Sequence, residues 1–167
     1  HRRCIAEVLA DGMDFNQELE FLRLIFESDS KNYHAWSYRI WLIERFSLWE
    51  GELDYAESLI DTEITNNSAW SYRYFLLNRC PNSEAGTVDF VRKELLYLTV
   101  KRLPLDITNE AAWVYLRGLY HTGATNDGNR IPLKDILPEL TPFLKSLPEN
   151  RFAVMCMADV NQVEGNL

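Results

Sequence analysis

The chain is poor in cysteine, and its cysteines follow neither a metal-binding pattern nor a disulfide-rich one. The 167 residues include three, Cys4, Cys80 and Cys156, an odd number at wide spacing. No CxxC pair and no Cys/His cluster occurs. This usage is typical of reduced thiols in a cytosolic protein. We therefore expect a cytoplasmic location and no metal bound by this chain alone.

Long apolar runs and basic runs are missing as well. No stretch approaches the roughly 20 residues of a membrane-spanning helix, and no secretory signal is recognised, so membrane insertion is not expected. The formal net charge is -8, and no dense Lys/Arg segment exists. Nucleic acid and anionic membrane surfaces are therefore not expected as partners, and a basic partner is favoured.

Signatures of self-contained catalysis are absent from the sequence. There is no P-loop, no GxSxG, no HExxH and no nucleophile with a recognisable base nearby. The alternation of Val, Ile and Thr that predicts strands is also missing. The chain does have large apolar side chains, because 47% of its residues are hydrophobic and 13% are aromatic. This composition excludes a disordered chain and allows a sizeable core.

One motif recurs three times, Asn-x-x-Ala-Trp-x-Tyr followed by Arg or Leu. Its copies occupy 32–39, 66–73 and 109–116. Trp36 and Trp70 are 34 positions apart, whereas Trp70 and Trp113 are 43 apart. We assign the extra residues to the loop after Pro81 and to the region around Val91. A second signature, Glu-Leu-x-Phe or Glu-Leu-x-Tyr, starts at positions 18, 52 and 94.

Helical periodicity surrounds every copy of the motif. The sequence predicts an all-α fold, a right-handed α-solenoid of antiparallel helix pairs. The 34-residue period is that of tetratricopeptide repeats, although their Trp-x-x-Leu-Gly pattern is absent. We predict a single helical-repeat domain over 1–167. Its parts are a partial repeat at 1–11, repeats at about 15–47, 50–80 and 87–121, and a degenerate last pair at 131–163.

The repeated Trp and Asn residues are predicted to be structural. Trp36, Trp70 and Trp113 stand at equivalent helical positions, which favours a place in the core between successive pairs. The Asn that opens each copy is expected to be an N-cap, because its side-chain oxygen satisfies a free backbone N–H. In the last pair, Val154 stands where a Trp would be expected.

Two arginines of the motif need partners. Arg39 and Arg73 each lie three residues after the Trp, on the same helical face. A guanidinium there must be paired or solvated. We predict Glu18 and Glu52, in the preceding helix of each pair, as the respective partners. Leu116 replaces the Arg in the third copy, so that unit is expected to do without this ion pair.

Tyr33 and His34 are the candidate binding residues. They occupy the first turn of a predicted helix, where N–H groups point outward and the helix dipole favours anions. Lys31 stands beside them. Together these residues would suit a phosphate or a carboxylate. A solvated first turn with no ligand is the alternative, and the residues alone leave both open.

The repeats resemble those of protein prenyltransferase α subunits, above all the α subunit shared by farnesyltransferase and geranylgeranyltransferase type I. The segments 32–41, 66–75 and 109–118 carry the resemblance, together with the junction at 46–53. It covers about residues 1–120. The resemblance implies an α subunit that scaffolds a β subunit, with zinc, and magnesium in some members, held through the β subunit.

The heterodimer of this family transfers farnesyl or geranylgeranyl from an isoprenoid diphosphate to a cysteine of CaaX protein substrates. By resemblance, Tyr33 and His34 match positions that line the diphosphate side of the active site. The family's catalytic lysine lies upstream of His1, and Lys31 is only its repeat-equivalent. The resemblance therefore implies a fragment that lacks the N-terminal repeats, contains no catalytic residue and is inactive alone.

Two other interpretations remain at this point. A non-catalytic helical-repeat adaptor would bind other proteins and show no affinity for a β subunit. The α subunit of the Rab-directed enzyme would carry further domains outside this stretch.

Overall fold

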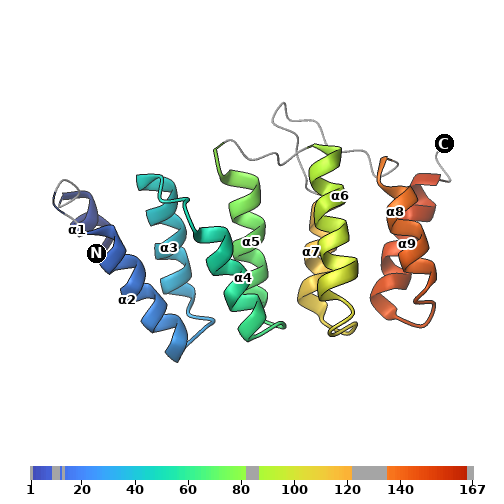
Figure 1. Ribbon diagram of the computed structural model, residues 1–167, viewed down its shortest axis with the longest axis horizontal. Coiled ribbons are helices and arrows are strands. Elements are labelled where there is room, and N and C mark those ends of the chain that lie inside the picture. The colour runs from blue at the N-terminus through green and yellow to red at the C-terminus, as the bar shows by residue number, and fades with distance from the viewer. Residues whose placement is uncertain (1, 9–11, 13, 82–86, 122–134, 165–167) are drawn as a thin grey trace. The chain divides into compact units, whose positions relative to one another are not determined.

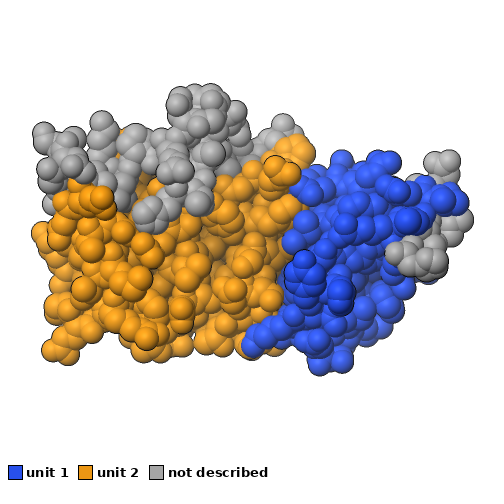
Figure 2. Space-filling model, turned by 180° about the vertical axis from the view of Figure 1, so that it is seen from behind, with its two compact units in different colours: residues 1–52 blue, residues 53–167 orange. Residues whose placement is uncertain are grey.

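The computed structural model describes residues 2–8, 12, 14–81, 87–121 and 135–164, and every regular element within them is helical (Figure 1). The elements are α1 (Arg2–Val8), α2 (Phe15–Ser28), α3 (Tyr33–Phe46), α4 (Glu52–Thr62), α5 (Asn67–Arg79), α6 (Val88–Leu96), η2 (Tyr97–Arg102), α7 (Glu110–His121), α8 (Leu137–Lys145) and α9 (Arg151–Glu164). The chain divides into two compact units, 1–52 and 53–167 (Figure 2). The predicted partial repeat at 1–11 and last pair at 131–163 each extend outside the described residues.

The first unit is built on the pairing of α2 with α3. α2 begins at Phe15 because Asp14 caps it. The Asp14 carboxylate accepts the Asn16 N–H at 3.0 Å. Aromatic contacts hold the two helices together, with the Phe26 and Trp36 ring centroids 4.2 Å apart. The two helices thus bury the apolar stripe that neither could cover alone.

An Asn caps the second helix of each pair, as predicted for Asn32, Asn66 and Asn109. Its side-chain oxygen accepts one or two first-turn N–H groups at 3.0–3.4 Å. Asn150 does the same for α9, at 3.0 and 3.1 Å. The degenerate last pair therefore keeps the cap of the motif although it has lost the Trp.

The three motif tryptophans are buried, at most 7% exposed. Each indole N–H donates to the carbonyl six residues earlier, at 2.7–2.9 Å. That carbonyl belongs to the turn between the two helices of a pair, so the Trp fixes the turn as well as filling the core. A buried indole N–H without such a partner would destabilise the fold.

In the second unit the same turn carbonyls also accept from the following repeat. The Asn109 side-chain amide donates to the Ile64 carbonyl at 2.7 Å, and Asn150 donates to the Ile107 carbonyl at 2.9 Å. Each Asn therefore caps its own helix and anchors the previous turn. Asn suits this double use because its side-chain oxygen accepts while its separate NH2 group donates, whereas an ionised Asp carboxylate could not donate.

Helix pairs of the second unit stack on one another. α5 contacts α7, α7 contacts α9, and α6 contacts α8. Trp70, Trp113 and Leu116 are central members of one continuous apolar core in this unit. The stacking of successive pairs is the arrangement that the repeat predicts. Among the described residues, no helix combines the length and apolar character needed to cross a membrane.

A π-helical segment interrupts the third pair. The sequence predicts one helix over about 87–103, but α6 gives way at Tyr97 to η2, which is π-helical. Glu94 and Trp113 are 19 positions apart, whereas the two earlier Glu-to-Trp spacings are 18. One extra residue is therefore accommodated in this helix, and our assignment of surplus residues to the region around Val91 misses that site.

Candidate functional site

Tyr33 and His34 project from the first turn of α3, and both are exposed. The Tyr33 side chain is 76% exposed. Their rings meet edge to face, with centroids 5.6 Å apart. Within the described part of the chain, neither side chain makes a hydrogen bond or an ion pair. The Tyr33 hydroxyl and the His34 imidazole are thus both available to a ligand.

Each residue of this pair lines a different groove of the first unit. Tyr33 lines one, together with Trp36, Ile40, Trp41 and Glu44. His34 lines the other, with Phe21, Leu22, Ile25, Tyr38 and Arg2. Arg3 and Ser37 line both grooves. Each groove therefore has an apolar wall beside a polar rim.

The electrostatic setting of the pair favours an anion. The cap by Asn32 places Tyr33 and His34 at the positive end of a 14-residue helix. Lys31 is exposed immediately before the cap. A hydroxyl, an imidazole and first-turn N–H groups at one helix end are donors suited to phosphate or carboxylate oxygens.

The equivalent first turn of α7 has different chemistry. Glu110 and Ala111 occupy it, and Glu110 faces Arg151 at 3.9 Å. A carboxylate at this position repels an anion. The donor pair of α3 is therefore not shared by α7.

The motif arginines join successive pairs, which corrects our assignment of their partners. Arg39 donates from Nε and Nη2 to both Glu52 oxygens, at 2.8 and 2.6 Å. Glu18, the partner that we predicted, instead accepts two bonds from Arg2 at 2.9 Å and one from the Tyr38 hydroxyl at 3.1 Å. The partner of Arg39 is therefore the Glu that follows its motif in the sequence and not the Glu that precedes it.

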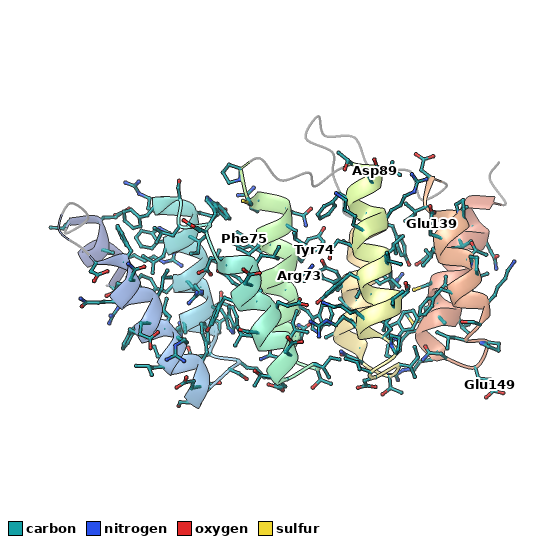
Figure 3. All side chains as sticks on the ribbon, viewed as in Figure 1. Arg73, Tyr74, Phe75, Asp89, Glu139 and Glu149 are labelled. Atoms are coloured by element: carbon teal, nitrogen blue, oxygen red, sulfur yellow. The ribbon has the colours of Figure 1, made fainter. Side chains whose placement is uncertain are left out.

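Arg73 reaches both Glu94 of the next pair and Glu57 of its own pair, so Glu52 was also the wrong partner for it. Its guanidinium contacts Glu94 at 2.8 and 3.3 Å and Glu57 at 3.1 Å. The Tyr115 hydroxyl donates to Glu94 at 2.5 Å. Arg73, labelled in Figure 3, thus lies on α5 among side chains of α4, α6 and α7.

The third pair replaces this arrangement with another. Leu116, at the Arg position, is fully buried in the core. The next residue, Arg117, contacts Asp159 of α9 at 3.1 Å, and the Tyr120 hydroxyl donates to Asp159 at 2.9 Å. We expected no ion pair at position 116, and the third repeat has none there. It forms one at the next residue instead, between Arg117 and Asp159.

A cluster of charged and hydroxyl side chains surrounds Glu57, and we did not predict it from the sequence. The Glu57 carboxylate accepts from Arg73, from the Tyr97 hydroxyl at 2.6 Å, and from Arg102. Arg102 also contacts Asp61 at 2.6 Å. Burial raises the pKa of the Tyr97 phenol above its usual range, and the bond to Glu57 adds to this. The 19-residue spacing was the available signal, because the π-helical turn contains both Tyr97 and Arg102.

Among the described residues, no group of three or more His, Cys, Asp or Glu side chains could hold a metal ion. Cys4 is exposed, Cys80 is half-buried and Cys156 is buried, and all three are free thiols. The residues that the structure describes therefore do not fit a zinc site.

Comparisons with known proteins identify the repeat. The family described as "Protein prenyltransferase alpha subunit repeat" matches residues 15–46 and 49–80. Among solved structures, a chain of Candida albicans protein geranylgeranyltransferase-I complexed with GGPP is similar, with 28% identity and a TM-score of 0.70. That match covers 97% of this chain and 52% of the other, so this chain spans about half its length. None of the curated protein sequences is significantly similar.

Proposed function

Because the chain belongs to the family of protein prenyltransferase α subunits, we propose that it serves in a heterodimeric CaaX protein prenyltransferase. There it scaffolds a β subunit and lines the diphosphate side of the active site. The complex transfers farnesyl or geranylgeranyl to a cysteine near the C-terminus of its protein substrate. The chain's motifs resemble those of the α subunit shared by farnesyltransferase and geranylgeranyltransferase type I.

The contrast between bonded and unbonded residues of the first motif copy supports a binding role for Tyr33 and His34. Asn32, Trp36 and Arg39 of the first copy are held by the internal bonds described above. Tyr33 and His34, in the same motif, are exposed and make no hydrogen bond within the described residues. An exposed donor pair within a buried scaffold motif supports a ligand-binding role at the first turn of α3.

The reaction sets the chemistry that this pair would perform. A C–S bond forms between the cysteine thiolate and C1 of the isoprenoid, while the C1–O bond breaks and the diphosphate leaves with the electron pair. Negative charge accumulates on the diphosphate oxygens in the transition state. The Tyr33 hydroxyl, and His34 through a ring N–H, would donate hydrogen bonds to these oxygens and stabilise that charge.

Zinc, where it takes part, would supply an activated thiolate and would be held by the β subunit. The described residues of this chain do not fit such a site. We therefore assign this chain no step of thiolate activation, and we expect it to transfer no prenyl group by itself.

Co-expression with a prenyltransferase β subunit tests the assignment. We expect the chain, in its full-length protein, to co-purify with that subunit at one-to-one stoichiometry through size-exclusion chromatography. A helical-repeat adaptor is the alternative function, and it would elute apart from the β subunit while retaining other protein partners. Elution apart would therefore overturn the proposal.

A further inference from the structure

Arg3 is held in place by neutral groups. Its Nη2 donates to the carbonyl and to the hydroxyl of Ser37, both at 2.8 Å. Its guanidinium carbon lies 5.6 Å from the centre of the Trp41 ring. Ser37 stands three residues after His34 and four after Tyr33, so all three share one face of α3. The guanidinium is therefore fixed beside the candidate donor pair.

The charge of Arg3 is not neutralised by the described residues, where its hydrogen-bond acceptors are the two Ser37 oxygens. Its neighbour Arg2 differs, because Glu18 neutralises it through two bonds at 2.9 Å. A guanidinium has five N–H donors, and Nη2 supplies two of them. The Nε and Nη1 donors of Arg3 remain available to an anion.

Arg3 lines both grooves described above, the one that Tyr33 lines (the Tyr33 groove) and the one that His34 lines (the His34 groove). Other charges face this region. Glu44 is an exposed carboxylate of the Tyr33 groove, and Glu18 is already bonded to Arg2. An anion that accepts from Tyr33 and His34 would thus meet the Arg3 guanidinium of α1, which no carboxylate among the described residues neutralises.

We propose that Arg3 is a binding residue for the diphosphate, acting with Tyr33 and His34 as a third donor group. The inference rests on the proposed function and extends it to a residue outside the repeat motif. The forked guanidinium matches two phosphate oxygens at once. Because Ser37 already orders the side chain, little rotamer entropy is lost on binding.

Inorganic pyrophosphate is the direct probe, titrated into the protein by isothermal calorimetry at low ionic strength, with and without the β subunit. We expect Arg3→Gln to weaken pyrophosphate binding about tenfold or more, since charge-assisted bonds are lost. Arg3→Lys should restore part of the affinity, because it keeps the charge and loses the fork. Ser37→Ala should give an intermediate loss, because the charge stays and its anchor weakens.

Arg45→Gln is the matched control. Arg45 is an exposed arginine of the same unit, it pairs with Glu7 at 3.7 Å, and it lines neither groove. Its removal changes the net charge equally and should alter pyrophosphate binding less than twofold. Circular dichroism of each variant checks that its total helix content and thermal unfolding match those of the unmodified protein.

The outcomes separate this inference from the function on which it rests. If Tyr33→Phe and His34→Gln weaken binding while Arg3→Gln does not, the anion site stands and the role of Arg3 is wrong. Equal losses in Arg3→Gln and Arg45→Gln would reduce the effect to general surface charge and also overturn it. If the unmodified protein binds no pyrophosphate in either form, both proposals fail.

Discussion

Arg39 and Glu52 form a two-pronged ion pair whose side chains are each only 4% exposed. It joins the second helix of one pair to the first residue of the next pair's first helix. Arg2 and Glu18 repeat this geometry, as do Arg73 and Glu94. The Glu-Leu-x-Phe/Tyr signature and the Arg of the motif are therefore two halves of one inter-repeat link.

Breaking this link on one side should be costly. We expect Glu52→Gln to lower the free energy of unfolding by about 3 kcal/mol, because Arg39 would keep a buried charge without its counterion. Urea denaturation followed by circular dichroism measures the change. Arg23→Gln is the control, since Arg23 pairs with Glu20 at an exposed site and its loss should cost less than about 1 kcal/mol.

The double variant Arg39→Met with Glu52→Leu distinguishes the effect of an unpaired buried charge from the effect of lost packing. Removing both charges leaves no buried ion, so the protein should recover most of the stability lost by Glu52→Gln. A double variant as unstable as Glu52→Gln would show that packing, and not the orphaned charge, accounts for the loss.

The buried hydroxyl of Tyr115 provides a second test of the scaffold. It donates to Glu94 at 2.5 Å, a bond to a charged acceptor. Tyr115→Phe should therefore destabilise the protein by about 2 kcal/mol. Tyr33→Phe is the control, because the exposed Tyr33 hydroxyl makes no hydrogen bond among the described residues and its removal should cost far less. Equal losses in thermal unfolding would contradict this ranking.

The helices, their caps and the burial of the tryptophans follow from local patterns. Asn before an apolar run fixes a helix start, and a Trp repeated at one helical position has few stable places outside a core. Such features depend on neighbours in sequence or on one periodic face. The roles of Asn32 and Trp36 could therefore be predicted correctly from the sequence.

The ion pairs could not be assigned in this way. Glu18 and Glu52 are equally spaced before their motifs, so spacing alone cannot say whether Arg39 faces its own pair or the next one. That choice depends on how the helix pairs stack, which is a property of the assembled chain. The Glu57 cluster depends in addition on the π-helical turn, whose only trace in the sequence is one extra residue before Trp113.

Substitutions of Tyr33 and His34 should lower catalytic turnover and leave the stability of the fold unchanged. Tyr33→Phe and His34→Gln remove donors from exposed side chains that contribute no bond to the scaffold among the described residues. In the assembled heterodimer we expect each to lower turnover by roughly tenfold to a hundredfold, as loss of one transition-state donor does. Thermal unfolding should stay within about 0.5 kcal/mol of the unmodified protein. A loss of stability that parallels the loss of turnover would assign the pair to the fold instead.

Alkaline pH should weaken the first unit through Tyr38. Burial, followed by the bond to Glu18, raises the pKa of Tyr38 from 10.0 to about 12. The neutral phenol is thus favoured in the folded state, and its contribution to stability is complete below pH 10. That contribution should be lost as the pH rises from 10 to 12. Urea titrations across this range should show a steeper decline for the unmodified protein than for Tyr38→Phe, and equal slopes would contradict the assignment.

Prenyl transfer by the assembled complex tests the central claim most directly. The full-length protein, co-expressed with a β subunit, is given a CaaX peptide and either farnesyl or geranylgeranyl diphosphate, and the thioether product is measured by mass spectrometry. We predict product with at least one donor, none from this chain alone, and a sharp decrease in the Tyr33→Phe, His34→Gln double variant. A stable complex that forms no thioether with either donor would contradict the account.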